Sequence, residues 1–205
     1  MYNEKRNLTM LTDLYQLTMM NGYLKHGMEN DEAVFDMFFR PLMNNSVYAV
    51  MAGLEQAIEY INDLHFTEKD IEYLKSLNIF DEEFFNYLRN FKFQGDIYAI
   101  AEGTPIFPSE PMIRVRAPIM QAQLIETALL NIINHQTLIA TKASKVVYAA
   151  AGTNVLEFGL RRAQGPMQEF MVRERQLLVD ALPQATCLPV NNTDFLQKEH
   201  MLTAG

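Results

Sequence analysis

The chain has 205 residues, 49% of them hydrophobic and 20% charged, which is the composition of a globular protein of one or two domains. The formal net charge of −8 argues against non-specific nucleic-acid binding, because that activity depends on a basic surface. A single cysteine excludes an intrachain disulfide, and no apolar run approaches the ~20 residues of a membrane span, so we expect a cytoplasmic protein with neither nucleic-acid nor membrane partners.

The chain is predicted to begin with a helix over residues 9–20. Leu14, Leu17 and Thr18 share a face at helical spacing, and Thr12 is a plausible N-cap. Gly22 should loosen the end of this helix.

Two strands and three helices are predicted next. An aromatic-rich segment at residues 33–40 and a shorter one at residues 47–51 favour strands. Apolar residues at helical spacing predict helices at residues 54–64, 67–77 and 82–91. Thr67 and Asp70 have the pattern of a capping box, and Asp81 is expected to cap the third helix.

The middle of the chain is predicted to form a small β-layer followed by a long helix. Residues 97–100 and 113–116 are short alternating segments, and the loop between them is rich in proline and glycine. Residues 121–151 have a broad apolar helical face, with a break indicated at Asn134 and His135. Gly152 is expected to end this helix.

A candidate ligand-binding stretch follows the long helix. Residues 155–158 are mostly apolar and predict a strand, which leads through Gly159 to Arg161 and Arg162. An aromatic ring beside two guanidinium groups suits a ligand with a flat ring and phosphates, because the ring can stack and a guanidinium matches phosphate oxygens. The alternative is a buried strand followed by two solvated arginines.

Residues 157–166, Glu-Phe-Gly-Leu-Arg-Arg-Ala-Gln-Gly-Pro, resemble the signature of nicotinate phosphoribosyltransferase. The resemblance extends upstream to about Asn7 and stops after Pro166. It implies an ATP-dependent enzyme of the ligase class that joins nicotinate to phosphoribosyl pyrophosphate in NAD biosynthesis, giving nicotinate mononucleotide and pyrophosphate. It also implies ATP and Mg²⁺ as further requirements, no tightly bound cofactor, and a homodimer.

The same resemblance implies roles for four substrate-binding residues. Tyr15 would pack against the pyridine ring of nicotinate in the partner subunit's site, although from the residues alone it can also be a core tyrosine with a hydrogen-bonded hydroxyl. Phe158 would be the opposing stacking platform and Arg161 a phosphate clamp, with Arg162 a weaker candidate. No catalytic residue is assigned, and no metal-ligand set is expected, because His135 has no partner at metal-ligand spacing.

The fold class implied by the resemblance is an α+β N-terminal domain over residues 1–120, followed by the start of an incomplete α/β (TIM-like) barrel of the type II phosphoribosyltransferase kind. Residues 121–166 would form the first helix and strand of that barrel, and residues 167–205 are an unassigned tail. The alternative to the enzyme is a non-catalytic truncated remnant or a dimerisation domain.

Overall fold

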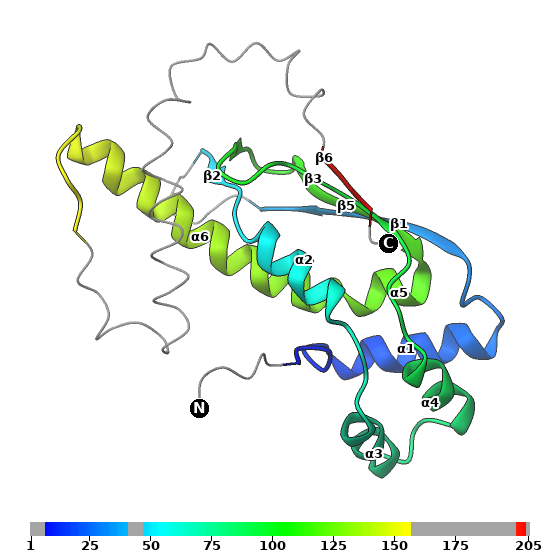
Figure 1. Ribbon diagram of the computed structural model, residues 1–205. Coiled ribbons are helices and arrows are strands. Elements are labelled where there is room, and N and C mark those ends of the chain that lie inside the picture. Colours follow the sequence, from blue (N-terminus) through cyan, green and yellow to red (C-terminus); the bar gives the residue numbers. More distant parts are fainter. Residues whose placement is uncertain (1–6, 41–46, 157–199, 204–205) are drawn as a thin grey trace.

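A computed structural model describes residues 7–40, 47–156 and 200–203 of the chain. The architecture is mixed α/β: Figure 1 shows an antiparallel sheet with helices packed below it. The elements in chain order are α1 (Leu14–Lys25), β1 (Glu32–Phe38), β2 (Ala49–Val50), α2 (Leu54–Asn62), α3 (Glu68–Ser76), α4 (Glu82–Arg89), β3 (Asp96–Ala99), β4 (Pro105–Ile106), β5 (Pro111–Pro118), α5 (Ile119–Leu124), α6 (Glu126–Ala150) and β6 (His200–Thr203).

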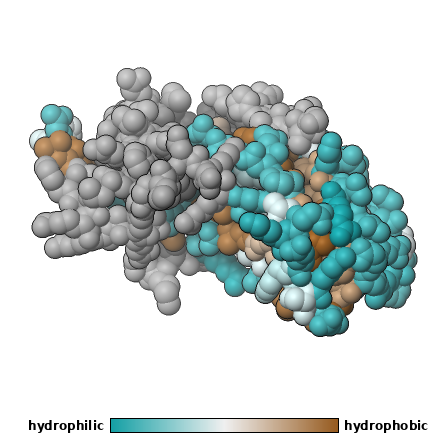
Figure 2. Space-filling view, turned by 60° about the horizontal axis from the view of Figure 1, so that its bottom comes forward, coloured by the Kyte–Doolittle hydropathy of each residue, from teal (hydrophilic) through white to brown (hydrophobic). Residues whose placement is uncertain are grey.

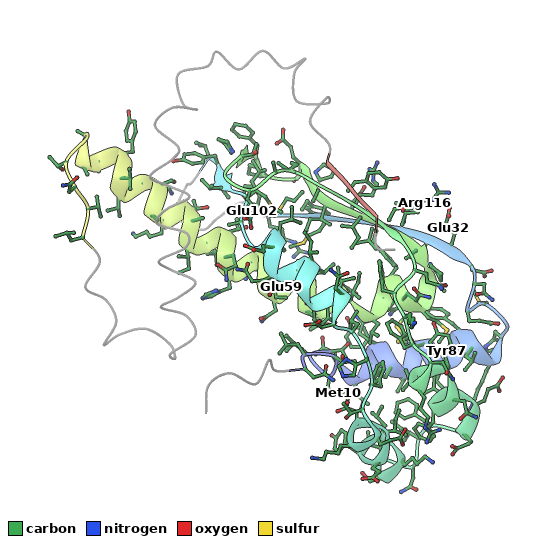
Figure 3. All side chains as sticks on the ribbon, viewed as in Figure 1. Met10, Glu32, Glu59, Tyr87, Glu102 and Arg116 are labelled. Atoms are coloured by element: carbon green, nitrogen blue, oxygen red, sulfur yellow. The ribbon has the colours of Figure 1, made fainter. Side chains whose placement is uncertain are left out.

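The larger sheet has the strand order β1-β5-β3-β6, and every neighbouring pair is antiparallel. Its outer face carries charged cross-strand pairs. Arg114 binds Asp36 through two hydrogen bonds of 2.7 and 2.9 Å, and Arg116 lies 2.9 Å from Glu32 (Figure 3). Because these charged pairs are exposed, they show which face of the sheet contacts solvent, and the opposite face packs on the core. Exposed ion pairs of this kind contribute little to stability.

One hydrophobic cluster joins the inner face of this sheet to α1, α2, α3, α4, α5 and the first part of α6. Its fully buried members include Met20 of α1, Phe84 of α4, Ile113 of β5 and Met120 of α5. The coloured part of the surface in Figure 2 is mostly hydrophilic, with separate hydrophobic areas. None of the helices in the described part of the chain is long and apolar enough to cross a membrane.

Gly95 allows the chain to enter β3 close to the backbone of β5. A Cβ atom at this position would lie 2.7 Å from the carbonyl oxygen of Arg116, a distance that real Cβ atoms essentially never show. A side chain here would therefore have to displace the neighbouring strand, which explains why the position is a glycine.

The small sheet, β2 paired with β4, is attached to α6 by a polar seam made of Thr137, Thr141 and Ser144. All three residues are buried. The Thr141 hydroxyl accepts a hydrogen bond from the Val50 amide at 2.9 Å and donates one to the Thr137 carbonyl at 2.6 Å. The Thr137 hydroxyl donates to the Ala52 carbonyl at 3.3 Å. These bonds satisfy polar groups that would otherwise be buried without partners.

The predicted elements up to residue 118 are present. The first helix is Leu14–Lys25, whereas the sequence predicts residues 9–20, and the other bounds differ by a few residues. The prediction of Thr12 as the first N-cap is wrong: Asp13 occupies that position in extended conformation, and the helix begins at Leu14. Gly22 does not loosen the helix, which continues to Lys25, because an unsubstituted glycine can stay in a helix whose other face is packed.

Two further predictions on the C-terminal side are wrong. The long helix is interrupted at Ile125, where the amide lies 3.4 Å from the Gln121 carbonyl, and it runs without a break through Asn134 and His135. Val155 and Leu156 form no strand, since none of the described strands pairs with them; the rest of that predicted strand lies outside the described residues.

The capping box of α3 provides a first stability test. The Thr67 hydroxyl accepts from the Asp70 amide, and the Asp70 carboxylate accepts from the Thr67 amide at 2.7 Å. Thr67→Ala should lower the free energy of unfolding by about 1 kcal/mol in urea denaturation, because it removes an N-cap. Ser76→Ala at the exposed other end of α3 is the control and should change it by less than about 0.5 kcal/mol. Equal effects of the two substitutions would contradict the role of the cap.

Candidate functional site

The candidate site begins where the start of α1 meets the start of α6. Asp13 is the N-cap residue of α1, but its side chain makes no cap hydrogen bond. Instead, its Oδ2 accepts a hydrogen bond of 3.0 Å from the Thr127 hydroxyl in the first turn of α6. A second bond joins the same two helix ends: Gln16 Nε2 donates to Glu126 Oε2 at 2.7 Å. Two side-chain hydrogen bonds therefore fix the start of α1 against the start of α6.

Tyr15 lies beside this junction with 53% of its surface exposed. Its hydroxyl oxygen accepts a hydrogen bond from Gln16 Nε2 at 2.9 Å. Partial desolvation and, after it, the nearby carboxylates of Glu126 and Asp13 raise the pKa of Tyr15, so the phenol is neutral at physiological pH. The alternative of a buried core tyrosine is therefore wrong, since half of the side chain is available for contact.

Gln16 is fully buried although it is polar. Its amide nitrogen reaches both Tyr15 and Glu126, so it connects an exposed aromatic hydroxyl to a carboxylate on another helix. We call Asp13, Tyr15, Gln16, Glu126 and Thr127 the junction cluster.

Two exposed apolar residues lie near Tyr15 in the sequence of α1. Leu14 and Met19 are 50% and 42% exposed, so the outward side of α1 offers an aromatic ring with apolar neighbours. Such a surface can stack on a flat ring or pack against another protein surface.

The remaining predicted substrate-binding residues, Phe158, Arg161 and Arg162, lie outside the described residues. Their roles stay predictions.

The described residues do not form a site for Mg²⁺. Among the side chains described within residues 7–40 and 47–156, no three of His, Cys, Asp or Glu lie together in a way that could hold a metal ion. His135 is half-buried in the middle of α6.

The sequence alone did not identify Gln16, Glu126 or Thr127 as site residues. Gln16 precedes Leu17 in the predicted helix, and a glutamine on a helix usually faces solvent, so its burial could not be expected. Glu126 and Thr127 begin a helix that was expected to start earlier. One signal could have pointed to Gln16: it is a polar residue next to Tyr15, the only aromatic residue of the predicted helix.

Three comparisons with known proteins point in one direction. The sequence profile of the nicotinate phosphoribosyltransferase (NAPRTase) N-terminal domain matches residues 10–134. The chain is 48% identical over 157 residues to the nicotinate phosphoribosyltransferase of Bacillus subtilis, and the match covers 77% of this chain and 32% of that protein. It is 44% identical over 156 residues to the nicotinate phosphoribosyltransferase pncB2 of Mycobacterium tuberculosis, with 76% and 34% covered.

A solved structure agrees with these relatives. The crystal structure of human nicotinic acid phosphoribosyltransferase matches with a TM-score of 0.76 and 34% sequence identity, covering 82% of this chain and 34% of the human chain. The chain thus spans about a third of the length of the curated relatives it matches.

Proposed function

The chain belongs to the nicotinate phosphoribosyltransferase family, and from that membership we propose that it supplies the N-terminal segment of an enzyme joining nicotinate to phosphoribosyl pyrophosphate. The products are nicotinate mononucleotide and pyrophosphate, on the route to NAD. The observation that carries the proposal is the match of residues 10–134 to the family's N-terminal domain. In this proposal, residues 121–166 begin an α/β barrel, and the enzyme acts in the cytoplasm.

The reaction requires the pyridine nitrogen to be brought against the anomeric carbon of the ribose while pyrophosphate leaves. Stacking can hold the flat ring in position, and cationic groups can stabilise the departing negative charge. In the proposed site, Tyr15 of one subunit covers one face of the pyridine ring in the partner's site, and Phe158 covers the other face. Arg161, with Arg162 as a weaker candidate, holds a phosphate group.

Support for Tyr15 comes from its exposure and from its anchored hydroxyl. A half-exposed ring beside apolar Leu14 and Met19 is free to contact a ligand or a second subunit. The hydrogen bond from Gln16 restricts the ring, which lowers the entropy lost on binding. These properties suit a ring that is presented to the active site of a homodimer.

Mg²⁺ bound to the phosphates would neutralise their charge, and ATP hydrolysis would drive the synthesis. We propose both requirements for the whole enzyme. The described residues do not fit a magnesium site, so no step of the chemistry is assigned through the metal here.

The alternative function is a non-catalytic dimerisation domain. The exposed apolar side chains Leu14 and Met19 on α1 and Tyr148 on α6 favour this alternative, since such side chains commonly pack against another protein surface. The two candidates make different predictions for a hybrid enzyme.

A chimera tests the proposal directly. Residues 7–156 would replace the aligned N-terminal part of the B. subtilis relative, to which the chain is 48% identical. We expect the chimera to form nicotinate mononucleotide in an assay with nicotinate, phosphoribosyl pyrophosphate, ATP and Mg²⁺. Tyr15→Ala in the chimera should raise KM for nicotinate roughly tenfold, because an aromatic stacking contact is lost.

The matched control is Tyr73→Ala on α3, where the ring is 58% exposed and lies outside the junction cluster. It should leave KM for nicotinate unchanged. A folded, dimeric chimera without activity would favour the dimerisation domain over the enzyme, and an equal KM for the two tyrosine variants would remove Tyr15 from the site.

A further inference from the structure

The amide of Gln16 has a defined orientation, because it faces a carboxylate. Glu126 Oε2 lies 2.7 Å from one terminal atom of the Gln16 side chain. An ionised carboxylate only accepts hydrogen bonds, so the atom that faces it must be the amide nitrogen and not the amide oxygen. The charge on Glu126 therefore fixes which end of the Gln16 amide points into the junction cluster.

This orientation determines the role of the Tyr15 hydroxyl. The nitrogen of Gln16 has two N–H groups; one is directed at Glu126 and the other at the Tyr15 hydroxyl oxygen, 2.9 Å away. Tyr15 is thus the acceptor in this contact, and its own proton is not used in it. The hydroxyl can donate that proton to an acceptor outside the cluster.

The arrangement is unusual for neighbouring residues of one helix. Side chains at adjacent helical positions normally diverge, yet those of Tyr15 and Gln16 meet at their tips. Gln16 is fully buried, and no donor among the described residues reaches its Oε1. An unsatisfied buried oxygen is unfavourable, and in this position it accompanies two hydrogen bonds donated by the amide nitrogen of the same side chain.

We infer that Glu126 and Gln16 form a positioning pair that fixes the Tyr15 ring and makes its hydroxyl a hydrogen-bond donor to a carboxylate oxygen of the bound pyridine substrate. The inference rests on the proposed function, in which Tyr15 lies against nicotinate. A carboxylate suits this donor because a hydrogen bond to a charged acceptor is stronger than one to a neutral oxygen. The pair acts through Tyr15, so neither residue needs to touch the substrate.

The first test measures the titration of Tyr15 in the complete 205-residue chain. Tyrosine labelled with ¹³C at Cζ reports ionisation of each phenol, and Tyr15→Phe identifies the Tyr15 signal among the nine tyrosines. Glu126→Gln should lower the pKa of Tyr15, because it removes a negative charge that opposes ionisation. Gln16→Met should raise the pKa of Tyr15, because it removes a donor to the phenolate and leaves the Glu126 charge in place.

Opposite shifts separate a positioning pair from a merely structural contact. If the two substitutions only loosened the junction, both would expose Tyr15 to water and both would lower the pKa of Tyr15. Glu83→Gln on α4 is the control for a general change of charge and should leave the Tyr15 signal unchanged. Shifts in the same direction, or no shifts, would overturn the inference.

The second test is a double-substitution cycle in the chimera. Tyr15→Phe and Gln16→Met should each raise KM for nicotinate roughly fivefold, as expected for one lost hydrogen bond, with kcat little changed. Adding Gln16→Met to Tyr15→Phe should have no further effect, since the hydroxyl it positions is already absent. Additive effects, or an unchanged KM in the Gln16→Met chimera, would overturn the positioning role.

The two tests distinguish the inference from the proposed function. An inactive unsubstituted chimera would count against the proposed function and, with it, against the substrate-directed role of the hydroxyl. The titration would still show whether Glu126 and Gln16 control Tyr15 in this chain.

Discussion

The 205-residue chain, purified on its own, is expected to form nicotinate mononucleotide at a rate orders of magnitude below that of the B. subtilis relative. It spans about a third of the length of its curated relatives. An active site in an α/β barrel takes its residues from the ends of several parallel strands. The strands described in this chain form two antiparallel sheets instead, so they do not supply such strand ends. A segment that holds only some of the residues of a catalytic unit keeps little of the rate enhancement, because such residues act together.

The measurement is product formation from nicotinate and phosphoribosyl pyrophosphate in the presence of ATP and Mg²⁺, followed by chromatography. The B. subtilis protein and the active chimera are the positive controls under the same conditions. Turnover of the chain within tenfold of the B. subtilis protein would show that the segment is sufficient for catalysis and that this prediction is wrong.

Phe84→Ala is expected to cause the largest loss of stability among single substitutions in the core. Phe84 is fully buried in α4, and its ring centroid lies 5.0 Å from that of Phe80. Truncation removes buried apolar surface and leaves a cavity, so the free energy of unfolding should fall by about 3–5 kcal/mol. Since small domains have total stabilities of about 5–15 kcal/mol, the variant should be close to unfolding at 37 °C.

Urea denaturation followed by circular dichroism measures this loss as a lower midpoint with an unchanged slope. The control is Tyr73→Ala on the neighbouring helix α3, where the exposed ring should contribute less than about 1 kcal/mol. A loss below about 1.5 kcal/mol for Phe84→Ala would mean that the surrounding helices collapse into the space and that the core is less rigid than its packing indicates.

The elements that could be predicted from sequence are those that depend on interactions between residues close together in the chain. The capping box at Thr67 and Asp70 and the cap at Asp81 depend on residues within one turn, and the structure confirms both. The first helix shows the limit of such signals. Thr12 and Asp13 are adjacent and both suit an N-cap; Asp13 is the N-cap residue, and the side chain it contacts, Thr127, is 114 positions away in the sequence.

The candidate site could be predicted only in part for the same reason. The family resemblance led to the prediction that Tyr15 binds substrate, but the residues that contact its hydroxyl could not be predicted from the neighbouring sequence. Gln16 and Glu126 are 110 positions apart, and their contact exists only because α1 packs against the start of α6. A buried glutamine also contradicts the usual preference of this residue for the surface, so helical periodicity could not reveal it.

The polar seam of α6 affects whether the edge of the small sheet can pair with a strand of another molecule. A strand with a free amide edge can recruit a strand from another molecule and so start ordered self-association. On the side of β2 that faces α6, the amide of Val50 is bonded to the hydroxyl of Thr141. Helix α6 thus occupies the place beside Val50 that an incoming strand would need, and Thr141 already satisfies the amide to which such a strand would bind.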